Sequence, residues 1–518
     1  MAGFDRAALE RALDQVPQRF KGPGGVAGVV KDGHVIARRA WGYRDSTARL
    51  PMDAGVRHPI CSITKQFTCG VLLDQIGDPA VLDARVAEYL PEYVEALPTA
   101  KQLCDNQSGL RDYWALTVLH GAVPEAEFRR KDGLALLMRM KTGHFAPGAA
   151  YSYCNCNFRI LAELIEAQTG RDMAELYATS IFAKAGMTTA VLSPDTRSPV
   201  DGLVGYEGND DIGFLPAQNG ITWIGDAGIS ASLDDMLAWE VYIDATRDDP
   251  DGLYNRLSVP PLYGDGTPAH YGYGLRHEVI AGAAVTGHGG GLRGFRSNRI
   301  HAASERLSVV VMFNHEANAH AATSWLMETA LGHDVKPQGI APRGWDGLWL
   351  DEAQGLAVRV AQDATGLTLR YATGPARLTV ADDGVARGPG VTLNRAPVGM
   401  TMQRTTENLT LTARPVSAAG PDDSAPVGRY WSDELEATLV VDARDGGCFA
   451  GFDGMLGAGP MERMYPLGKD LWVITTRRSM DAAPPGDWTV QVHRDGQGAV
   501  VGLTVGCWLA RRISYRRV

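Results

Sequence analysis

Several signatures that would assign this chain to a common class are absent. The 518 residues contain no Gly-x-Ser-x-Gly elbow, no Cys-x-x-Cys pair and no His-Glu-x-x-His motif, so the usual α/β-hydrolase, redox and zinc-protease patterns are missing. No Lys/Arg-rich run occurs, and the net charge of −10 argues against a nucleic-acid partner. No apolar run is long enough to span a bilayer. We therefore expect no cofactor, no nucleic acid and no membrane partner.

Cysteine is scarce, and its spacing is not that of a disulfide framework. The chain has seven cysteines, an odd number, which favours free thiols in a reducing compartment. Residues 1–20 carry charges on an amphipathic helical pattern and not the apolar centre of a signal peptide. These features together predict a cytoplasmic protein.

The composition is that of an ordinary globular protein, with 45% hydrophobic and 21% charged residues, and its length suits about three domains. Residues 1–335 show strand patterns at both ends and helical patterns between them, which predicts an α+β unit with an antiparallel sheet and a helical region. Pro- and Gly-rich stretches at 336–344 and 417–426 are typical of linkers. The alternating short β patterns of 345–416 and 426–518 predict two small antiparallel β-barrels.

The chain's only Ser-x-x-Lys joins Ser62 and Lys65. Apolar residues recur after it at helical spacing as far as residue 76, which predicts a helix with the serine at its start. The lysine lies three residues on, so its amine can reach the serine hydroxyl. A desolvated lysine can take the proton of a serine nucleophile, and a helix N-terminus favours a developing anion. Alone, such a pair more often marks a helix cap and a surface lysine.

The only Tyr-x-Asn consists of Tyr153 and Asn155, which follow a predicted turn. Alternate residues on an irregular turn point the same way, so the phenol and the amide can share one cleft. A tyrosine beside a lysine ammonium is expected to ionise more easily and to relay protons. The asparagine can orient the substrate or the lysine. In isolation, a turn asparagine beside a half-buried tyrosine is the commoner interpretation.

A third motif is the glycine-rich stretch that begins His288-Gly289-Gly290-Gly291. Its glycines allow a ligand to approach the backbone closely. The same stretch nominally matches a dinucleotide-binding fingerprint, but a strand is predicted after it and no βαβ context surrounds it, so we reject a nucleotide site.

These motifs stand in the order Ser-x-x-Lys, Tyr-x-Asn, His-x-Gly. In this order the first 335 residues resemble the penicillin-recognising serine hydrolases, which include class C β-lactamases and DD-carboxypeptidases. That family has Lys-Thr-Gly or His-x-Gly as its third motif. Lys141-Thr142-Gly143 also spells the third motif but precedes Tyr153, and we expect Gly143 to close a helix over 134–140.

Within that family, the whole chain resembles the bacterial D-stereospecific aminopeptidases, which add two small β-barrels to the catalytic fold. The resemblance implies release of N-terminal D-residues, D-alanine above all, from peptides and amides, with no cofactor. It also implies a homodimer and inhibition by β-lactams. The alternatives are a β-lactamase, esterase or DD-peptidase of the same family, or a non-catalytic module that only binds a peptide or a β-lactam.

The resemblance also implies roles for the motif residues. Ser62 is expected to form an acyl-enzyme, with Lys65 as the first-choice base and Tyr153 as its partner. The backbone N–H groups of Ser62 and Gly291 are expected to form the oxyanion hole. Asn155, His288 and Gly290 are expected to bind or orient the substrate.

Residues 471–476 and 488–493 predict paired strands joined by a long loop, and long ordered loops are often functional. An aminopeptidase must recognise a free ammonium, and none of the three motifs offers a spare carboxylate. Asp481, near the tip of the loop, can supply it, and Asp487 is the weaker candidate. An acid there would also repel the carboxylate of a β-lactam.

Overall fold

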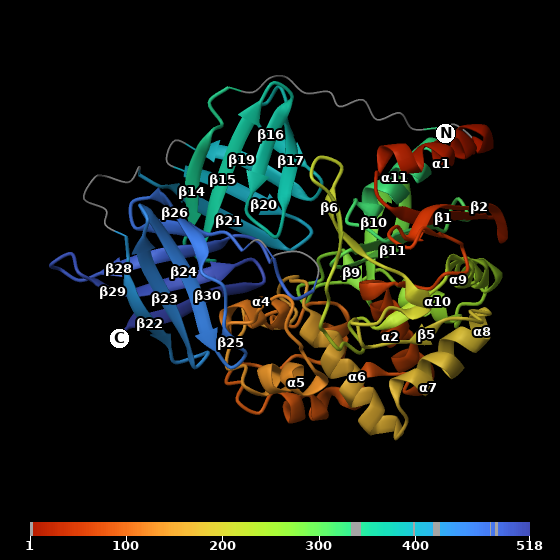
Figure 1. Cartoon of the computed structure of the whole chain (residues 1–518), viewed down its shortest axis with the longest axis horizontal. Coiled ribbons are helices and arrows are strands. Elements are labelled where there is room, and N and C mark those ends of the chain that lie inside the picture. The colour runs from red at the N-terminus through yellow and green to blue at the C-terminus, as the bar shows by residue number, and fades with distance from the viewer. Residues whose placement is uncertain (1–3, 333–342, 397–398, 418–424, 477, 482–484) are drawn as a thin grey trace.

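The computed structural model describes residues 4–332, 343–396, 399–417, 425–476, 478–481 and 485–518. Figure 1 shows an N-terminal body that carries the labelled helices, with two β-barrels beside it. The linkers predicted at 336–344 and 417–426 lie mostly outside the described residues.

An antiparallel sheet of eight strands forms the centre of the N-terminal body, in the order β3-β2-β1-β13-β12-β11-β10-β9. Its strands are β1 (Gly24–Lys31), β2 (His34–Asp45), β3 (Leu50–Pro51), β9 (Tyr271–Gly272), β10 (Leu275–Ile280), β11 (Ala283–Leu292), β12 (Phe295–Ala302) and β13 (Leu307–Phe313). Strand patterns over 25–30 and 34–41 predict a hairpin. It is confirmed, since Lys31 pairs with His34 across a two-residue turn. The residue pattern over 272–278 predicts one strand. This prediction is wrong, because a turn at Tyr273 and Gly274, both with positive φ, divides the segment into β9 and β10.

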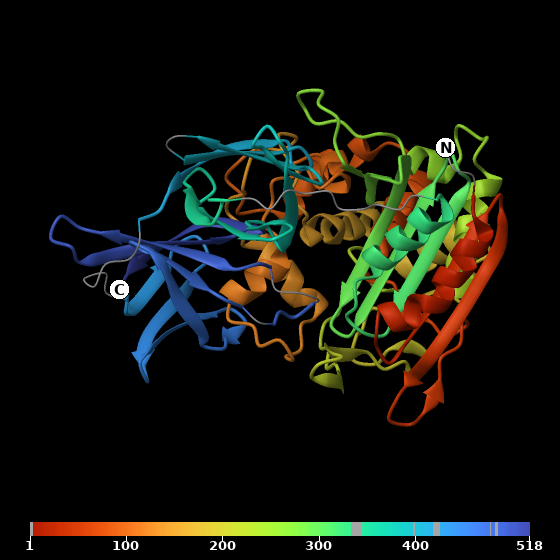
Figure 2. The same cartoon turned by 90° about the horizontal axis from the view of Figure 1, so that it is seen from above.

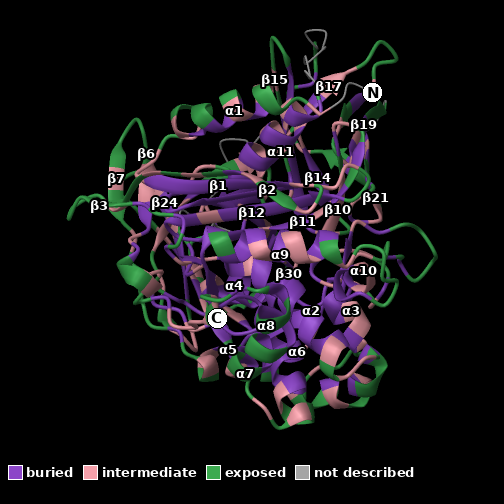
Figure 3. Cartoon of the chain, turned by 90° about the vertical axis from the view of Figure 1, so that its right-hand side faces the viewer, coloured by how far each residue is buried: buried purple, intermediate pink, exposed green. Residues whose placement is uncertain are grey.

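Helices cover both faces of this sheet (Figure 2). The two helices α1 and α11 pack on one face, where Leu13, Val309 and Leu326 belong to one buried cluster. Helices α2, α6 and α9 belong to the cluster on the other face. The central strands β1, β12 and β13 are therefore buried on both sides, and Figure 3 shows β1 and β12 in the buried colour. Strands β2 and β3 at one edge stay largely exposed or half-buried. The helices are α1 (Arg6–Arg19), α2 (Thr64–Gln75), α3 (Ala100–Cys104), α4 (Tyr113–Leu119), α5 (Arg130–Met138), α6 (Asn155–Thr169), α7 (Met173–Tyr177), α8 (Ala183–Ala185), α9 (Leu233–Ala245), α10 (Leu253–Leu257) and α11 (Ala319–Ala330).

The sequence predicts a helix cap at Ser232 and a helix end at Gly170, and both are confirmed. Ser232 caps α9 by accepting from the Asp235 backbone N–H, and Gly170 closes α6 in the left-handed conformation, φ 69°. The expectation for Gly143 is wrong. Helix α5 ends at Met138 with Arg139 as its cap, and Gly143 instead donates its N–H to a Glu95 carboxylate oxygen.

Two small barrels follow, as predicted. The first closes on itself through β14 (Gly347–Asp351), β15 (Leu356–Asp363), β16 (Gly366–Arg370), β17 (Pro375–Val380), β18 (Ala386–Gly388), β19 (Val391–Ala396), β20 (Gly399–Arg404) and β21 (Leu409–Pro415). The second contains β22 (Gly428–Ser432), β23 (Ala437–Arg444), β24 (Gly447–Gly454), β25 (Gly457–Ala458), β26 (Glu462–Gly468), β27 (Leu471–Ile474), β28 (Trp488–Arg494), β29 (Val500–Cys507) and β30 (Ala510–Arg517), and a β23–β24 pairing closes it.

The second barrel packs directly on the N-terminal body. One buried apolar cluster includes Phe67 of α2, Trp114 of α4 and Trp488 of β28. At the same contact the Arg111 guanidinium donates to the Arg511 carbonyl at 2.7 Å. Because burial removes apolar surface from water, this contact stabilises the position of the second barrel on the N-terminal body.

All seven cysteines, each within the described residues, are free and buried. None of the described helices is long and apolar enough to cross a membrane. Within the same residues, no cluster of three or more His, Cys, Asp or Glu side chains could hold a metal ion.

Candidate active site

Ser62 lies in a short 3₁₀ turn, Cys61–Ile63, that leads directly into α2. Cys61 has a φ of 51°, in the left-handed region that a residue with a side chain rarely adopts. Backbone strain of this kind persists where the surrounding structure enforces it, often at functional sites. The turn therefore presents the serine at the helix start in a fixed orientation.

The Lys65 ammonium is fully buried and has three partners. Its Nζ lies 3.0 Å from Ser62 Oγ, 2.8 Å from Asn155 Oδ1 and 2.7 Å from the carbonyl oxygen of Asp226. Burial lowers the pKa of Lys65 to about 8, although the neighbouring carboxylates of Asp226 and Asp112 oppose this shift.

Two of these three partners can only accept hydrogen bonds. A neutral Lys65 amine has two N–H donors and one lone pair, and the donors suit Asn155 Oδ1 and the Asp226 carbonyl. The lone pair is then left for the Ser62 hydroxyl, 3.0 Å away. This geometry suits proton transfer from serine to lysine.

The side chain of Asn155, the first residue of α6, is held in one orientation by Asp112. Asn155 Nδ2 donates to Asp112 Oδ2 at 2.8 Å, which turns its amide oxygen toward Lys65. Burial raises the pKa of Asp112 to about 6. The Asp112 backbone N–H in turn donates to the Leu509 carbonyl of the second barrel at 3.0 Å, so this barrel supports the lysine network.

The Asp226 carboxyl group is the second buried acid near the lysine. It accepts a hydrogen bond from Tyr113 Oη at 2.6 Å, and burial raises its pKa. Its charge raises the pKa of Lys65. Asp226 therefore limits how far burial can lower the basicity of the amine.

Tyr153 lies beside Ser62, but its pKa is not lowered there. Its ring faces Lys65 Nζ, with 5.0 Å between the nitrogen and the ring centroid. Burial raises the pKa of Tyr153 well above its ordinary value and outweighs the opposing hydrogen bond to Ser62 and the charge of Arg276. The expectation of a lowered pKa is wrong, because desolvation exceeds the electrostatic benefit.

His288 is buried on β11 with both ring nitrogens engaged. Nδ1 faces the Gly289 carbonyl, an obligate acceptor, so this nitrogen carries the proton. Nε2 then accepts from Tyr271 Oη at 2.9 Å. Burial lowers the pKa of His288 well below its ordinary value, so the ring is neutral. Its hydrogen bond with Tyr271 connects β11 to β9.

Strand β11 can lie against the backbone at Ile60, directly before the Cys61–Ile63 turn, because Gly290 has no side chain. A Cβ there would lie 2.2 Å from the Ile60 carbonyl oxygen. The Ser297 hydroxyl on the neighbouring strand donates to the same carbonyl at 3.1 Å. This close approach brings Gly291, the next residue of the strand, close to the Ser62 turn.

The predicted loop of the second barrel reaches this site. Strands β27 and β28 pair as expected, Ile474 with Trp488. In the loop between them, the Asp481 carbonyl accepts from the Arg293 backbone N–H at 2.7 Å, one residue beyond β11. The charge of Asp481 raises the pKa of Lys65, so this acid acts on the lysine electrostatically.

Asp487 and the early Lys141-Thr142-Gly143 stretch lie in contacts between domains and not at Ser62. Asp487 forms an ion pair with Arg359 of the first barrel and does not reach the cleft. The sequence also predicts that Pro484 and Pro485 stiffen the loop, and Pro484 lies outside the described residues. The Thr142 hydroxyl donates to Glu434 of the second barrel at 2.8 Å, so the early Lys-Thr-Gly belongs to the domain contact.

Sequence reasoning missed Asp112, Asp226 and Tyr271. The hydrogen bond from Lys65 to Asp226 joins positions 161 apart, and that from Asn155 to Asp112 joins positions 43 apart. The one available signal was an acid flanked by glycines in Gly225-Asp226-Ala227-Gly228, a pattern too common to be specific.

Comparison with known proteins agrees with this geometry. Residues 9–333 match the β-lactamase family model, and residues 339–516 match the model of D-aminopeptidase domain B. A D-aminopeptidase of Cereibacter sphaeroides is 64% identical over 516 residues, which cover 99% of this chain and 100% of that protein. The chain belongs to the D-aminopeptidase family. A D-aminopeptidase of Brucella anthropi is 49% identical and is matched over the full length of both chains.

Solved structures show that the D-aminopeptidase family shares its fold with more distant proteins. A D-stereospecific amidohydrolase from Streptomyces has a TM-score of 0.50 at 23% identity and covers 63% of this chain and 98% of its own. A D-amino acid amidase from Ochrobactrum anthropi SV3 has a TM-score of 0.51 at 17% identity and covers 62% of this chain and 97% of its own. An octameric penicillin-binding protein homologue from Pyrococcus abyssi has a TM-score of 0.54 at 16% identity, with 88% and 99% covered.

Proposed function

We propose that this protein is a D-aminopeptidase that releases N-terminal D-residues, D-alanine above all, from short peptides and amides through a serine acyl-enzyme. The observations that carry the proposal are the Ser62–Lys65 pair and the hydrogen bond that holds the Asp481 backbone at the end of β11, so that an acid lies on the side of this pair where β11 ends. A serine nucleophile needs no acid at that position, whereas a free substrate ammonium does. The full-length relatives named D-aminopeptidase support the D-configuration.

In the acylation step, neutral Lys65 takes the proton of Ser62 Oγ as this oxygen attacks the substrate carbonyl carbon. The N–H groups of Ser62 and Gly291 hold the oxyanion that forms. The C–N bond then breaks and the departing amine receives the proton. Water hydrolyses the resulting ester by the reverse proton path. The raised pKa of Tyr153 and the lowered pKa of Lys65 favour the lysine as base, with the phenol as a hydrogen-bond partner that stays protonated.

Substrate selection follows from the charge at the cleft. Asp481 attracts an ammonium and repels a carboxylate, so amines are favoured over penicillins. Asn155 acts through Lys65, and His288 acts through Tyr271 and β11, so both are positioning residues in this account.

The activity assay compares p-nitroanilides of D-alanine, L-alanine and N-acetyl-D-alanine. We expect turnover of the D-alanine compound, with the other two at least about 100-fold poorer in kcat/KM, because a misplaced or uncharged amine loses a charge-assisted hydrogen bond. Preference for the acetylated compound would indicate an esterase or DD-peptidase. An absence of turnover with all three, and with simple esters, would favour a binding module.

The pH dependence of kcat/KM is expected to follow the deprotonation of Lys65, the proposed base. With a Lys65 pKa of about 8, kcat/KM is expected to rise by about tenfold per pH unit below that value and to level off above it. Asp226→Asn keeps an acceptor for Tyr113 but removes the charge that raises the pKa of Lys65, so the rising limb should move to lower pH.

The substrate amine also titrates, so the profiles are recorded for D-alanine derivatives whose amines differ in pKa. The rising limb should stay in place among these substrates, and the falling limb should follow the amine. A rising limb that Asp226→Asn leaves unmoved would argue against Lys65 as the titrating base.

Location, assembly and inhibition are narrower proposals. The free thiols of all seven cysteines support a reducing compartment, and we propose the cytoplasm. The homodimer rests on the family resemblance, and sedimentation equilibrium decides it. β-Lactams are proposed as weak inhibitors, because they acylate serine nucleophiles but carry a carboxylate that Asp481 repels.

A further inference from the structure

The loop segment 478–481, called the Asp481 loop here, belongs to the second barrel but forms ion pairs with the N-terminal body. Glu125 lies at the centre of this contact, between α4 and α5. Its Oε1 pairs with Arg478, three residues before Asp481, and also accepts from Arg293 Nη1 at 3.2 Å. One carboxylate therefore joins a guanidinium of the loop to a guanidinium of the body. We call this set of three side chains, Arg478, Glu125 and Arg293, the clamp.

The clamp is anchored firmly on the side of the N-terminal body. Arg293 is 1% exposed, and its Nη2 donates to the carbonyl oxygens of Pro124 and Gln218. On the loop side, Arg478 Nη2 donates to Glu207 of β6 (Tyr206–Asn209) at 2.7 Å. Arg478 thus bridges two acids of the N-terminal body at the base of the described loop segment.

The clamp is connected to β11 through the backbone of Arg293. Arg293 follows directly after β11, and its backbone N–H donates to the Asp481 carbonyl at 2.7 Å. Within the loop, the Ser479 hydroxyl donates to Asp481 Oδ1 at 3.0 Å. A shift of Arg293 would therefore move both the end of β11 and the acid that faces the substrate amine.

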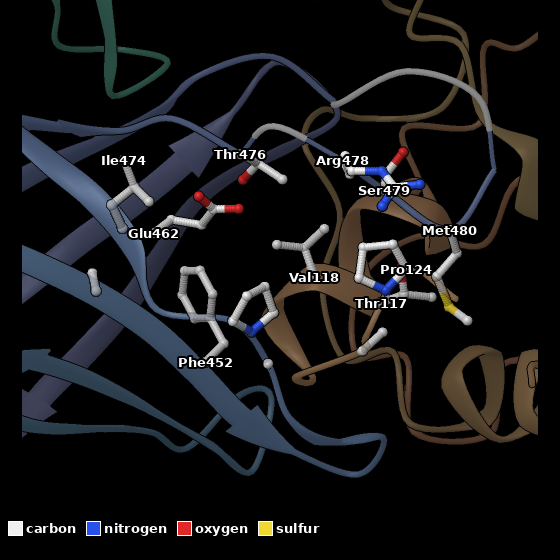
Figure 4. Close-up of a pocket in the computed structure, with 14 residues that line it drawn as sticks. Thr117, Val118, Pro124, Phe452, Glu462, Ile474, Thr476, Arg478, Ser479 and Met480 are labelled. Carbon is white, nitrogen blue, oxygen red and sulfur yellow. The ribbon is translucent and has the colours of Figure 1, made fainter. Parts of the chain in front are cut away.

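The loop residue between these contacts is apolar and buried. Met480 is 3% exposed and lines a narrow pocket between α4 and the second barrel, together with Val118, Pro124 and Phe452 (Figure 4). Undocking of the loop would expose this thioether to water and to oxidants. Met480 is thus a built-in reporter of docking.

From this geometry we propose that Glu125 is a positioning residue that holds the Asp481 loop in the cleft by joining Arg478 to Arg293. The selectivity for free amines then depends on a contact between two domains and not on Asp481 alone. The inference rests on the proposed role of Asp481 in amine recognition. The clamp itself is defined by contacts that do not depend on that role.

The test is Glu125→Gln in the full-length protein, which keeps the size of the side chain and removes its charge. The KM for D-alanine p-nitroanilide should rise about two- to fivefold, because the ion pair is partly exposed and KM grows as the docked fraction of the loop falls. The kcat should stay within about twofold, because a bound ammonium holds the loop docked. The rate of Met480 oxidation by dilute peroxide, followed by peptide mass spectrometry, should rise at least about fivefold as the undocked fraction grows.

The matched control is Glu127→Gln, two residues away. Glu127 pairs with Arg129 and Arg197 in the N-terminal body, so this variant should match the wild type in KM and in Met480 oxidation. Arg478→Gln also loses the contact with Glu207, so its effects should be at least as large as those of Glu125→Gln. The double variant should add little to Arg478→Gln, because that change already breaks the Arg478–Glu125 link. Wild-type Met480 oxidation in Glu125→Gln, or a wild-type KM for the free amine, would overturn the proposal.

Asp481→Asn, assayed in parallel, separates this inference from the proposed function. If Asp481→Asn weakens the free-amine preference while Glu125→Gln and Arg478→Gln do not, amine recognition stands and the clamp is refuted. If Asp481→Asn leaves the preference intact, amine recognition by this acid is refuted, and the Met480 oxidation rate alone decides whether the clamp docks the loop.

Discussion

Ser62→Ala is expected to lower kcat on D-alanine p-nitroanilide by at least about 10⁴-fold, and Lys65→Ala by a similar factor. The two residues act as a unit, 3.0 Å apart, so the double variant should be hardly worse than either single variant. Lys65→Arg is the sharper test. Arginine keeps the positive charge but cannot give up its proton at working pH. Activity should therefore be lost if Lys65 acts as a base, and kept if only its charge is needed.

Controls for these variants concern folding. Ser62→Ala at a helix start should cost about 1 kcal/mol or less of stability, so its thermal unfolding should stay close to that of the wild type. Ser304→Ala, at an exposed turn of the same body, is the matched serine change and should retain full activity. Substantial turnover by Lys65→Arg would transfer the role of base to another group, with Tyr153 the nearest candidate.

Asp481→Asn is expected to raise KM for D-alanine p-nitroanilide by about 10- to 100-fold, the value of one hydrogen bond to a charged group. The amide has the shape of the carboxylate and can accept from Ser479, so the loop should keep its conformation. The preference for the free amine over its N-acetylated counterpart should fall by the same factor, because an uncharged substrate gains nothing from Asp481.

Asp445→Asn provides the matched control. This acid lies exposed at the β23–β24 turn of the same barrel, and asparagine tolerates its positive φ as well as aspartate does. Its kinetics should be those of the wild type. An Asp481→Asn enzyme that kept its full selectivity for the free amine would show that another group recognises the ammonium.

The parts of the site that the sequence predicted are those fixed over short distances along the chain. Ser62 and Lys65 meet because three residues of helix bring their side chains to one face. The 24–45 hairpin follows from strand alternation around a two-residue turn. The motif order of a known family then relates Tyr153 and His288 to the serine without any knowledge of the path between them.

The parts that sequence could not predict depend on tertiary packing. Asp226 contacts the lysine through its backbone carbonyl, and no residue type announces a carbonyl contact. The acidity of Tyr153 was misjudged because neighbouring charge can be anticipated from motifs, whereas the extent of burial cannot. The clamp joins positions 125, 293 and 478, which no local pattern relates.

Ser62 is expected to become acylated by substrates that carry a free D-amino group. The direct measurement is intact-protein and peptide mass spectrometry after rapid acid quenching of the enzyme with D-alanine methyl ester. We expect a mass increase of one alanyl residue on the peptide that contains Ser62, little with L-alanine or N-acetyl-D-alanine methyl ester, and none in Ser62→Ala. An alanyl adduct on another residue, or equal labelling by the N-acetylated ester, would contradict the account.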